Sequence, residues 1–244
     1  MRSLAILALC TVLPLQAQTP SAPQFEVASI KPCKADLGSS SGIRTRPGRL
    51  DAYNVTLKRC IIGAYSLGPH QVLGGPEWLD SARFEIAAKA DQPTDDDAKL
   101  MLMLQGLLAD RFKLVVHRET REMSALVLEI ARNGPKLEKS AGGESVTNTS
   151  SGNTGVTIEV RNTSMDAFAQ ILSRKMDLPV VDHTGLDGVF NFKLSWTPDT
   201  AKPSDTAGPS IFTAVQEQLG LRLHSMKTAV EILVIDHAEK PSAN

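Results

Sequence analysis

The sequence has almost no net charge, few cysteines and no recognisable catalytic motif. Its 244 residues carry a formal charge of -1 and include 3 cysteines. A nucleic-acid-binding domain generally presents a basic stripe, so this balance argues against a nucleic-acid partner. With 42% hydrophobic residues the chain can nevertheless bury one large core or two small ones.

The five histidines show none of the spacings that bind zinc, such as H-E-x-x-H or H-x-x-x-H. No S-x-x-K motif, phosphate-binding loop or dinucleotide fingerprint is present either. The sequence therefore predicts no catalytic residue, no metal site and no cofactor. It favours a protein without enzymatic activity, and a hydrolase with an unrecognised site is the alternative.

One turn is a candidate for a functional site. His183 lies between Asp182 and Asp187 in a glycine-containing turn, where a catalytic or metal-binding role is conceivable. The competing interpretation is ordinary turn chemistry, in which aspartate and glycine satisfy backbone groups. If the chain were a hydrolase, these three residues would form its site, with Ser195 or Arg118 as distant helpers.

The first 18 residues have the features of a signal peptide. Arg2 supplies the positive charge, residues 4–15 form an apolar run, and Leu15-Gln16-Ala17 resembles a cleavage site. The run is too short for a stable membrane span, so we expect none after cleavage. This predicts export to the periplasm or the medium. An uncleaved anchor is the alternative.

Two cysteines, Cys33 and Cys60, remain after cleavage of this segment. An even count in an oxidising compartment favours one disulfide. It would close a loop of roughly 27 residues and stabilise the fold by about 3 kcal/mol. The alternative is a pair of buried free thiols.

The remaining chain reads as a diverged duplication. Matching patterns recur at an offset of about 108 residues, as in Asn54-Val55-Thr56 and Asn162-Thr163-Ser164. Residues 139–155 are rich in Gly, Ser and Thr and predict a linker between subdomains at 25–138 and 156–241. We expect an α+β fold of two similar βαβ-βαββ subdomains, with small mixed sheets covered by helices.

Helix and hairpin boundaries follow from local patterns. Thr56, Thr94 and Ser164 are placed to cap helices, and a further helix is expected from 211 to 219 before Gly220. The apolar, charged, apolar pattern of residues 112–130 predicts two strands, 112–118 and 124–131, joined by a charged turn. Residues 221–235 predict a second such hairpin, with His117 and His224 on sheet surfaces.

Four stretches together resemble an uncharacterised secreted family abundant in acidobacteria, a domain of unknown function. They are Phe25-Glu26-Val27-Ala28-Ser29-Ile30-Lys31-Pro32, Leu107-Leu108-Ala109-Asp110-Arg111-Phe112-Lys113-Leu114, Val181-Asp182-His183-Thr184-Gly185-Leu186-Asp187-Gly188 and Val234-Ile235-Asp236-His237-Ala238-Glu239-Lys240-Pro241. Some members carry this domain fused to membrane zinc peptidases of the β-lactam-sensor type. This chain has no zinc motif, so that activity does not carry over, and the family supplies no agreed catalytic residues.

The layout of the second half is also similar to the short N-terminal domain of secretins and TonB-dependent receptors, with Leu219-Gly220-Leu221 before its closing strands. That similarity implies a periplasmic protein-interaction module. Taken together, we expect an exported, non-enzymatic module that binds an unknown envelope protein or a small ligand. A sensory domain for cell-wall fragments is a further alternative, implied by the fusions.

Overall fold

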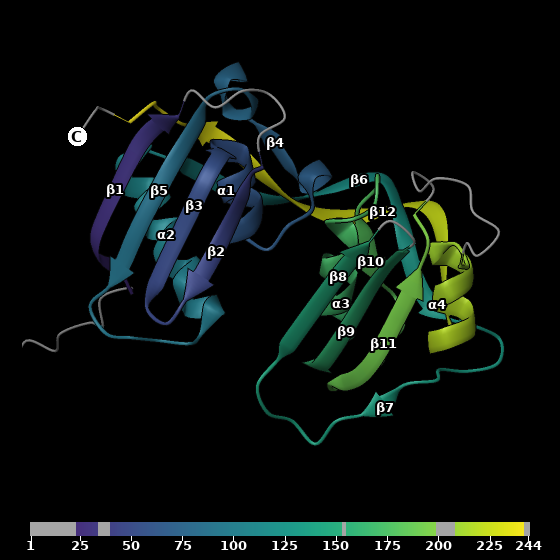
Figure 1. Ribbon diagram of the computed structural model, residues 1–244. Helices are drawn as coiled ribbons and strands as arrows, with labels where there is room; N and C mark the ends of the chain where they lie inside the picture. The colour runs from purple at the N-terminus through teal and green to yellow at the C-terminus, as the bar shows by residue number, and fades with distance from the viewer. Residues whose placement is uncertain (1–22, 34–39, 153–154, 199–207, 242–244) are drawn as a thin grey trace, which may run out of the picture.

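The chain forms two lobes in the computed structural model, joined by a ribbon of two long strands that has one short strand added at each edge (Figure 1). The structure describes residues 23–33, 40–152, 155–198 and 208–241, so the expected signal peptide at 1–18 lies outside the described residues. Each lobe has a four-stranded sheet with helices on one face, which confirms the predicted α+β class with small sheets.

The first lobe is built on the sheet β1-β5-β3-β2, whose neighbouring strands are all antiparallel. Alternate residues of β5, among them Phe84 and Ile86, face the covering helices α1 and α2. The elements of this half of the chain are β1 (Phe25–Cys33), β2 (Gly42–Arg46), β3 (Arg49–Thr56), α1 (Leu57–Ala64), η1 (Pro69–Gln71), β4 (Val72–Gly74), η2 (Glu77–Asp80), β5 (Arg83–Ala90), α2 (Asp97–Arg111) and β6 (Val115–Ile130).

The second lobe repeats this plan on the sheet β7-β11-β9-β8. Its elements are β7 (Glu138–Lys139), β8 (Val146–Gly152), β9 (Gly155–Thr163), α3 (Met165–Ser173), β10 (Val180–Asp182), β11 (Phe190–Trp196), α4 (Ile211–Leu219) and β12 (Leu221–His237). The order from β2 to β6 therefore recurs from β8 to β12. Strand β8 lies inside the segment that its composition predicted to be a linker.

The repeat extends to unusual backbone conformations. Asn54 and Asn162, which are 108 positions apart, both adopt a left-handed conformation, with φ of 50° and 51°. Each lies among the last three residues of a strand, β3 or β9, that leads into a helix. Asparagine is one of the few residues other than glycine that tolerates this region. The two halves thus share local geometry as well as element order.

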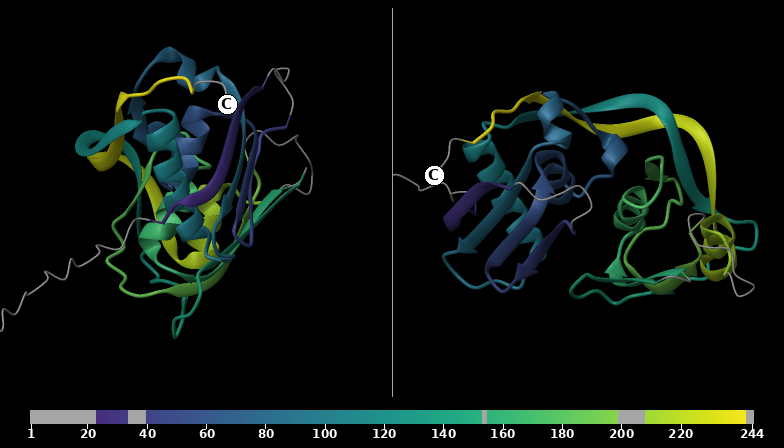
Figure 2. Two further views of the ribbon diagram at one scale, coloured as in Figure 1. Left: turned by 90° about the vertical axis from the view of Figure 1, so that its left-hand side faces the viewer. Right: turned by 45° about the horizontal axis from the view of Figure 1, so that its top comes forward.

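The two long strands correct the predicted hairpins. Residues 112–130 and 221–235 were each expected to fold back on themselves, but β6 and β12 are single strands that pair with each other. Their antiparallel register runs from Leu221 opposite Ile130 to Ile235 opposite Val116. The right-hand view in Figure 2 shows this ribbon passing over both lobes.

The ribbon also exchanges strands between the repeats. The short strand β4 of the first repeat pairs in parallel with β12, and β10 of the second repeat pairs in parallel with β6. Leu233 and Ile235 of β12 are buried in the core of the first lobe, whereas Leu126 and Leu128 of β6 are buried in the core of the second. Each lobe is therefore completed by a long strand from the other repeat.

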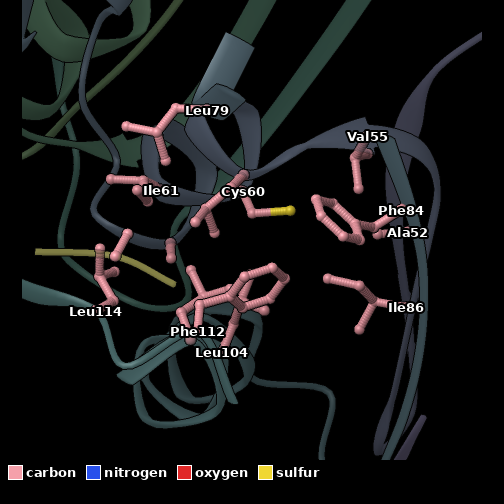
Figure 3. Packing of buried hydrophobic residues seen from close by; sticks show 14 of the residues in the cluster. Ala52, Val55, Cys60, Ile61, Leu79, Phe84, Ile86, Leu104, Phe112 and Leu114 are labelled. Carbon is pink, nitrogen blue, oxygen red and sulfur yellow. The ribbon is translucent and has the colours of Figure 1, made fainter. Parts of the chain in front are cut away.

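The core of the first lobe is centred on Phe112, which is fully buried at the end of α2. Its ring lies 5.2 Å from that of Phe84 and 6.5 Å from that of Trp78, measured between centroids. Figure 3 shows Phe112, Phe84 and Cys60 in the same packed layer between helix and sheet. Aromatic pairs at such separations add to the area that they bury.

The helix caps follow the sequence with one exception. Thr56 and Ser164 accept hydrogen bonds from the backbone N–H of Arg59 and Ala167, as predicted. Helix α4 has the predicted bounds and ends at Gly220 in a left-handed conformation. For α2 the prediction of Thr94 was wrong, because the side chain of Asp96 accepts from Lys99 N–H.

Candidate functional site: a basic cleft at the seam between the lobes

The two lobes touch where the segment after α1 meets the end of α3. Gly68 approaches the backbone of Ser173 so closely that an added Cβ would lie 2.7 Å from the Ser173 carbonyl oxygen. Beside this contact the Arg174 guanidinium donates to the Ser66 carbonyl at 3.4 Å. This contact defines the seam between the lobes.

A cleft of about 510 Å³ opens beside the seam. It is lined by Ile43, Thr56, Lys58, Arg59, Ile62, Gly63, Pro69, Asp80 and Arg174. All but Arg174 come from the first lobe, and Arg174 follows α3 of the second. Ligand pockets of proteins commonly have this size and occur where two domains meet. We call this feature the seam cleft.

The lining of the seam cleft carries three basic side chains and one acidic side chain. The Lys58 ammonium pairs with the Asp80 carboxylate at 3.2 Å. The described contacts of the Arg59 and Arg174 guanidinium groups are to backbone carbonyls, those of Ser41 and Ser66, each at 3.4 Å. These distances are longer than the usual 2.9–3.0 Å of such bonds. Two cations of the cleft are therefore weakly engaged.

Lys58 and Arg59 lie in the first turn of α1, an unfavourable place for cations. The N-terminus of a helix is electrically positive and favours acidic residues, at about 0.3–1 kcal/mol for each charge. Helices α2 and α3 follow that rule with Asp97 and Asp166, whereas the first turn of α1 has no acidic residue. The field of the helix thus adds to the positive potential at this wall of the cleft.

The lining residue that comes from the second lobe is positive as well. Arg174 is still exposed, but partial burial lowers the pKa of its guanidinium. Burial, and then the charge of Arg174, lower the pKa of the neighbouring Lys175 ammonium. Both shifts show that positive charge is disfavoured here in the absence of a counterion. An anion beside Arg174 would relieve that cost.

The turn at Asp182, His183 and Asp187 lies elsewhere, beside β6. The Asp182 carboxylate accepts from Thr184 N–H at 2.8 Å, and His183 N–H donates to the Leu128 carbonyl at 2.9 Å. The side chains of His183 and Asp187 are exposed. These are the contacts that turn chemistry requires, and a catalytic or metal-binding role for the turn stays the untested alternative.

The two residues named as distant helpers lie in different parts of the molecule. Ser195 on β11 shares a hydrogen bond with Thr157 of β9 at 2.9 Å. Arg118 on the ribbon pairs with Glu231 of the facing strand. Neither of these contacts involves the turn at residues 182–187.

Cys33 and Cys60 are free cysteines in the structure. Pro32 of β1 pairs with buried Phe84 of β5, and because neighbouring residues of a strand face opposite sides, Cys33 faces away from the core. The Cys60 sulfur points into that core, and burial raises the pKa of its thiol to about 12 (Figure 3). A disulfide would require the end of β1 to turn, and its formation remains a prediction.

His117 and His224 lie on the ribbon, which confirms their predicted place on a sheet surface. His117 Nδ1 lies 2.8 Å from a carboxylate oxygen of Asp236, and this hydrogen bond raises the pKa of the imidazole. In the described part of the chain, no group of three or more His, Cys, Asp or Glu residues could hold a metal ion. None of the described helices is long and apolar enough to cross a membrane.

The sequence did not single out any residue of the seam cleft as functional. A signal was nevertheless present, since Thr56 predicted a helix start and Lys58-Arg59 fall in the first turn after it, where acidic residues are preferred. Arg174 carries no comparable signal, because its position in the cleft depends on how the two lobes meet.

Comparison with known proteins identifies a family. Residues 58–238 match a family described as a protein of unknown function (DUF3738). The matched range includes both arginines of the seam cleft and the whole ribbon. No curated protein and no solved structure matches the chain.

Proposed function

Because the chain belongs to the DUF3738 family, whose function is unknown, we propose a function from its geometry: it is an exported, non-enzymatic module that binds a small ligand in the seam cleft. The pattern of residues 1–18 supports export.

A single observation carries the proposal. The cleft combines two weakly engaged guanidinium groups, Arg59 from one repeat and Arg174 from the other, with an apolar lining. Neither repeat alone would supply both arginines. Binding sites generally pair an apolar surface with a few converging polar groups, which is the composition found here.

The test is retention of small molecules by the folded chain. The purified mature protein is incubated with an extract of the envelope or the culture medium, washed and denatured, and the released compounds are identified by mass. The matched variant is Gly63→Phe, which fills the cleft from α1 without changing its charge. An added Cβ at Gly63 would lie 3.2 Å from Ile43 Cδ1, the end of a side chain, which must shift slightly to admit it.

We expect at least one compound to be retained by the wild-type chain and lost in Gly63→Phe, while circular dichroism shows both proteins folded. If both proteins retain the same compounds in the same amounts, binding occurs elsewhere and the proposed site is wrong.

A further inference from the structure

The lining of the seam cleft also indicates the chemical class of its ligand, an inference that rests on the proposed function. We propose that the ligand is a small organic anion in which a carboxylate or phosphate group is joined to an apolar moiety. The charged group would lie between Arg59 and Arg174, and the apolar moiety against Ile43, Ile62 and Pro69.

The charged end follows from the hydrogen-bonding capacity of arginine. A guanidinium presents a rigid fork of donors that matches the paired oxygens of a carboxylate or phosphate. Arg59 and Arg174 now direct this fork toward single carbonyl oxygens at 3.4 Å. An oxyanion would replace these weak contacts with shorter, charge-assisted hydrogen bonds. Lys58 already has a carboxylate partner in Asp80 and would contribute mainly its field.

The apolar end follows from the other lining residues. Ile43 and Ile62 are partly buried, and Pro69 is exposed, so apolar surface remains in contact with water inside the cleft. Covering such surface contributes roughly 25 cal/mol per Å². A bare inorganic ion would leave this part of the 510 Å³ cleft unused. An anion with a short hydrocarbon or ring would cover it.

The position of Arg174 means that ligand binding should also hold the two lobes together at the seam. It belongs to the second lobe, whereas the other lining residues belong to the first, so a bound anion bridges the seam. We therefore expect binding to slow amide hydrogen exchange at residues 66–68 and 173–174. Local openings of such segments are suppressed by anything that binds the closed form alone.

The test uses four defined probes in calorimetric titrations of the mature protein: octanoate, octyl phosphate, octanamide and inorganic phosphate. Octanamide keeps the chain and lacks the charge, whereas phosphate keeps the charge and lacks the chain. Arg59→Gln and Arg174→Gln remove one cation of the cleft each. Arg161→Gln is the matched control, since Arg161 lies on β9 and its described partner is Glu159.

We expect octanoate or octyl phosphate to bind about tenfold more tightly than octanamide and inorganic phosphate, and about tenfold more weakly to each cleft variant. Arg161→Gln should bind like the wild type. The better of the two alkyl anions identifies the oxyanion.

Equal affinity for octanamide, or unchanged affinity in both cleft variants, would overturn the anion assignment. Equal affinity for inorganic phosphate would overturn the apolar moiety, and so would the failure of both alkyl anions to bind at millimolar concentration. In all these cases the retention experiment with Gly63→Phe still decides separately whether the cleft binds any ligand.

Discussion

Shortening Leu233 to alanine should destabilise the first lobe, although Leu233 follows the whole second lobe in the sequence. Leu233 lies on β12 and is 1% exposed in the core that also holds Val72 and Ile235. Removing a buried leucine side chain costs its transfer free energy and leaves a cavity, about 2–5 kcal/mol in total. A site near the end of the chain would otherwise be expected to cost little, because termini often fray.

Denaturant titration measures the loss of unfolding free energy. Amide hydrogen exchange shows which lobe is destabilised. We expect the amides of α1 and β5 in the first lobe to lose at least as much protection as those of α3 and β11. The matched control is Leu102→Ala on α2, where the side chain is 52% exposed and the change should cost less than about 1 kcal/mol.

The converse variant is Leu128→Ala on β6, which is fully buried in the core of the second lobe although β6 belongs to the first repeat. A loss below about 1 kcal/mol for Leu233→Ala would contradict the exchanged strands. Loss of protection confined to α3 and β11 in Leu233→Ala would also contradict them.

Three further predictions concern the seam, the ribbon and the cysteines. Gly68→Ala should destabilise the chain by about 1–3 kcal/mol because the new Cβ meets the Ser173 carbonyl, whereas Gly106→Ala, with open space around it, should be neutral or stabilising in thermal unfolding. The stability that His117 gains from Asp236 should be complete below the ordinary histidine pKa near 6.5 and should disappear as the pH rises through the raised pKa of His117. In an NMR titration, Asp236→Asn should lower the pKa of His117. An unchanged pKa would refute the contact. At pH 8 without reductant, a thiol reagent should label Cys33 and leave buried Cys60 unlabelled in the folded protein; if neither reacts until a reductant is added, the predicted disulfide is present.

The duplication could be found in the sequence because it is written in local signals that survive divergence. Caps at Thr56 and Ser164, and asparagines 108 positions apart, each reflect a backbone requirement within a few residues. Helix bounds such as those of α4 follow from the same short-range chemistry. These signals do not depend on which distant segment packs against the element.

The sequence pattern of the ribbon resembles a hairpin because the centre of the ribbon has no lobe to pack against. Thr120, Arg121 and Glu122 are exposed, so this part of β6 is polar and resembles a turn between two apolar strands. The same stretch lacks the glycine, proline or asparagine that a tight turn generally uses. That absence was the available sign of a continuous strand. The partner of β6, by contrast, lies about a hundred positions away and leaves no local trace.

The exchanged strands have a consequence for how the chain reaches its folded state. The core of the first lobe includes Leu233, Ile235 and Ala238, so it cannot close until these residues, which follow the second lobe's helices in the sequence, have been synthesised. Contacts between such distant positions make folding slow, because a long loop must be ordered first. If the chain is exported as proposed, this delay would keep it unfolded while it crosses a membrane. The same exchange means that removal of β12 would take Leu221 and Leu223 from the core of the second lobe as well as Leu233 and Ile235 from that of the first.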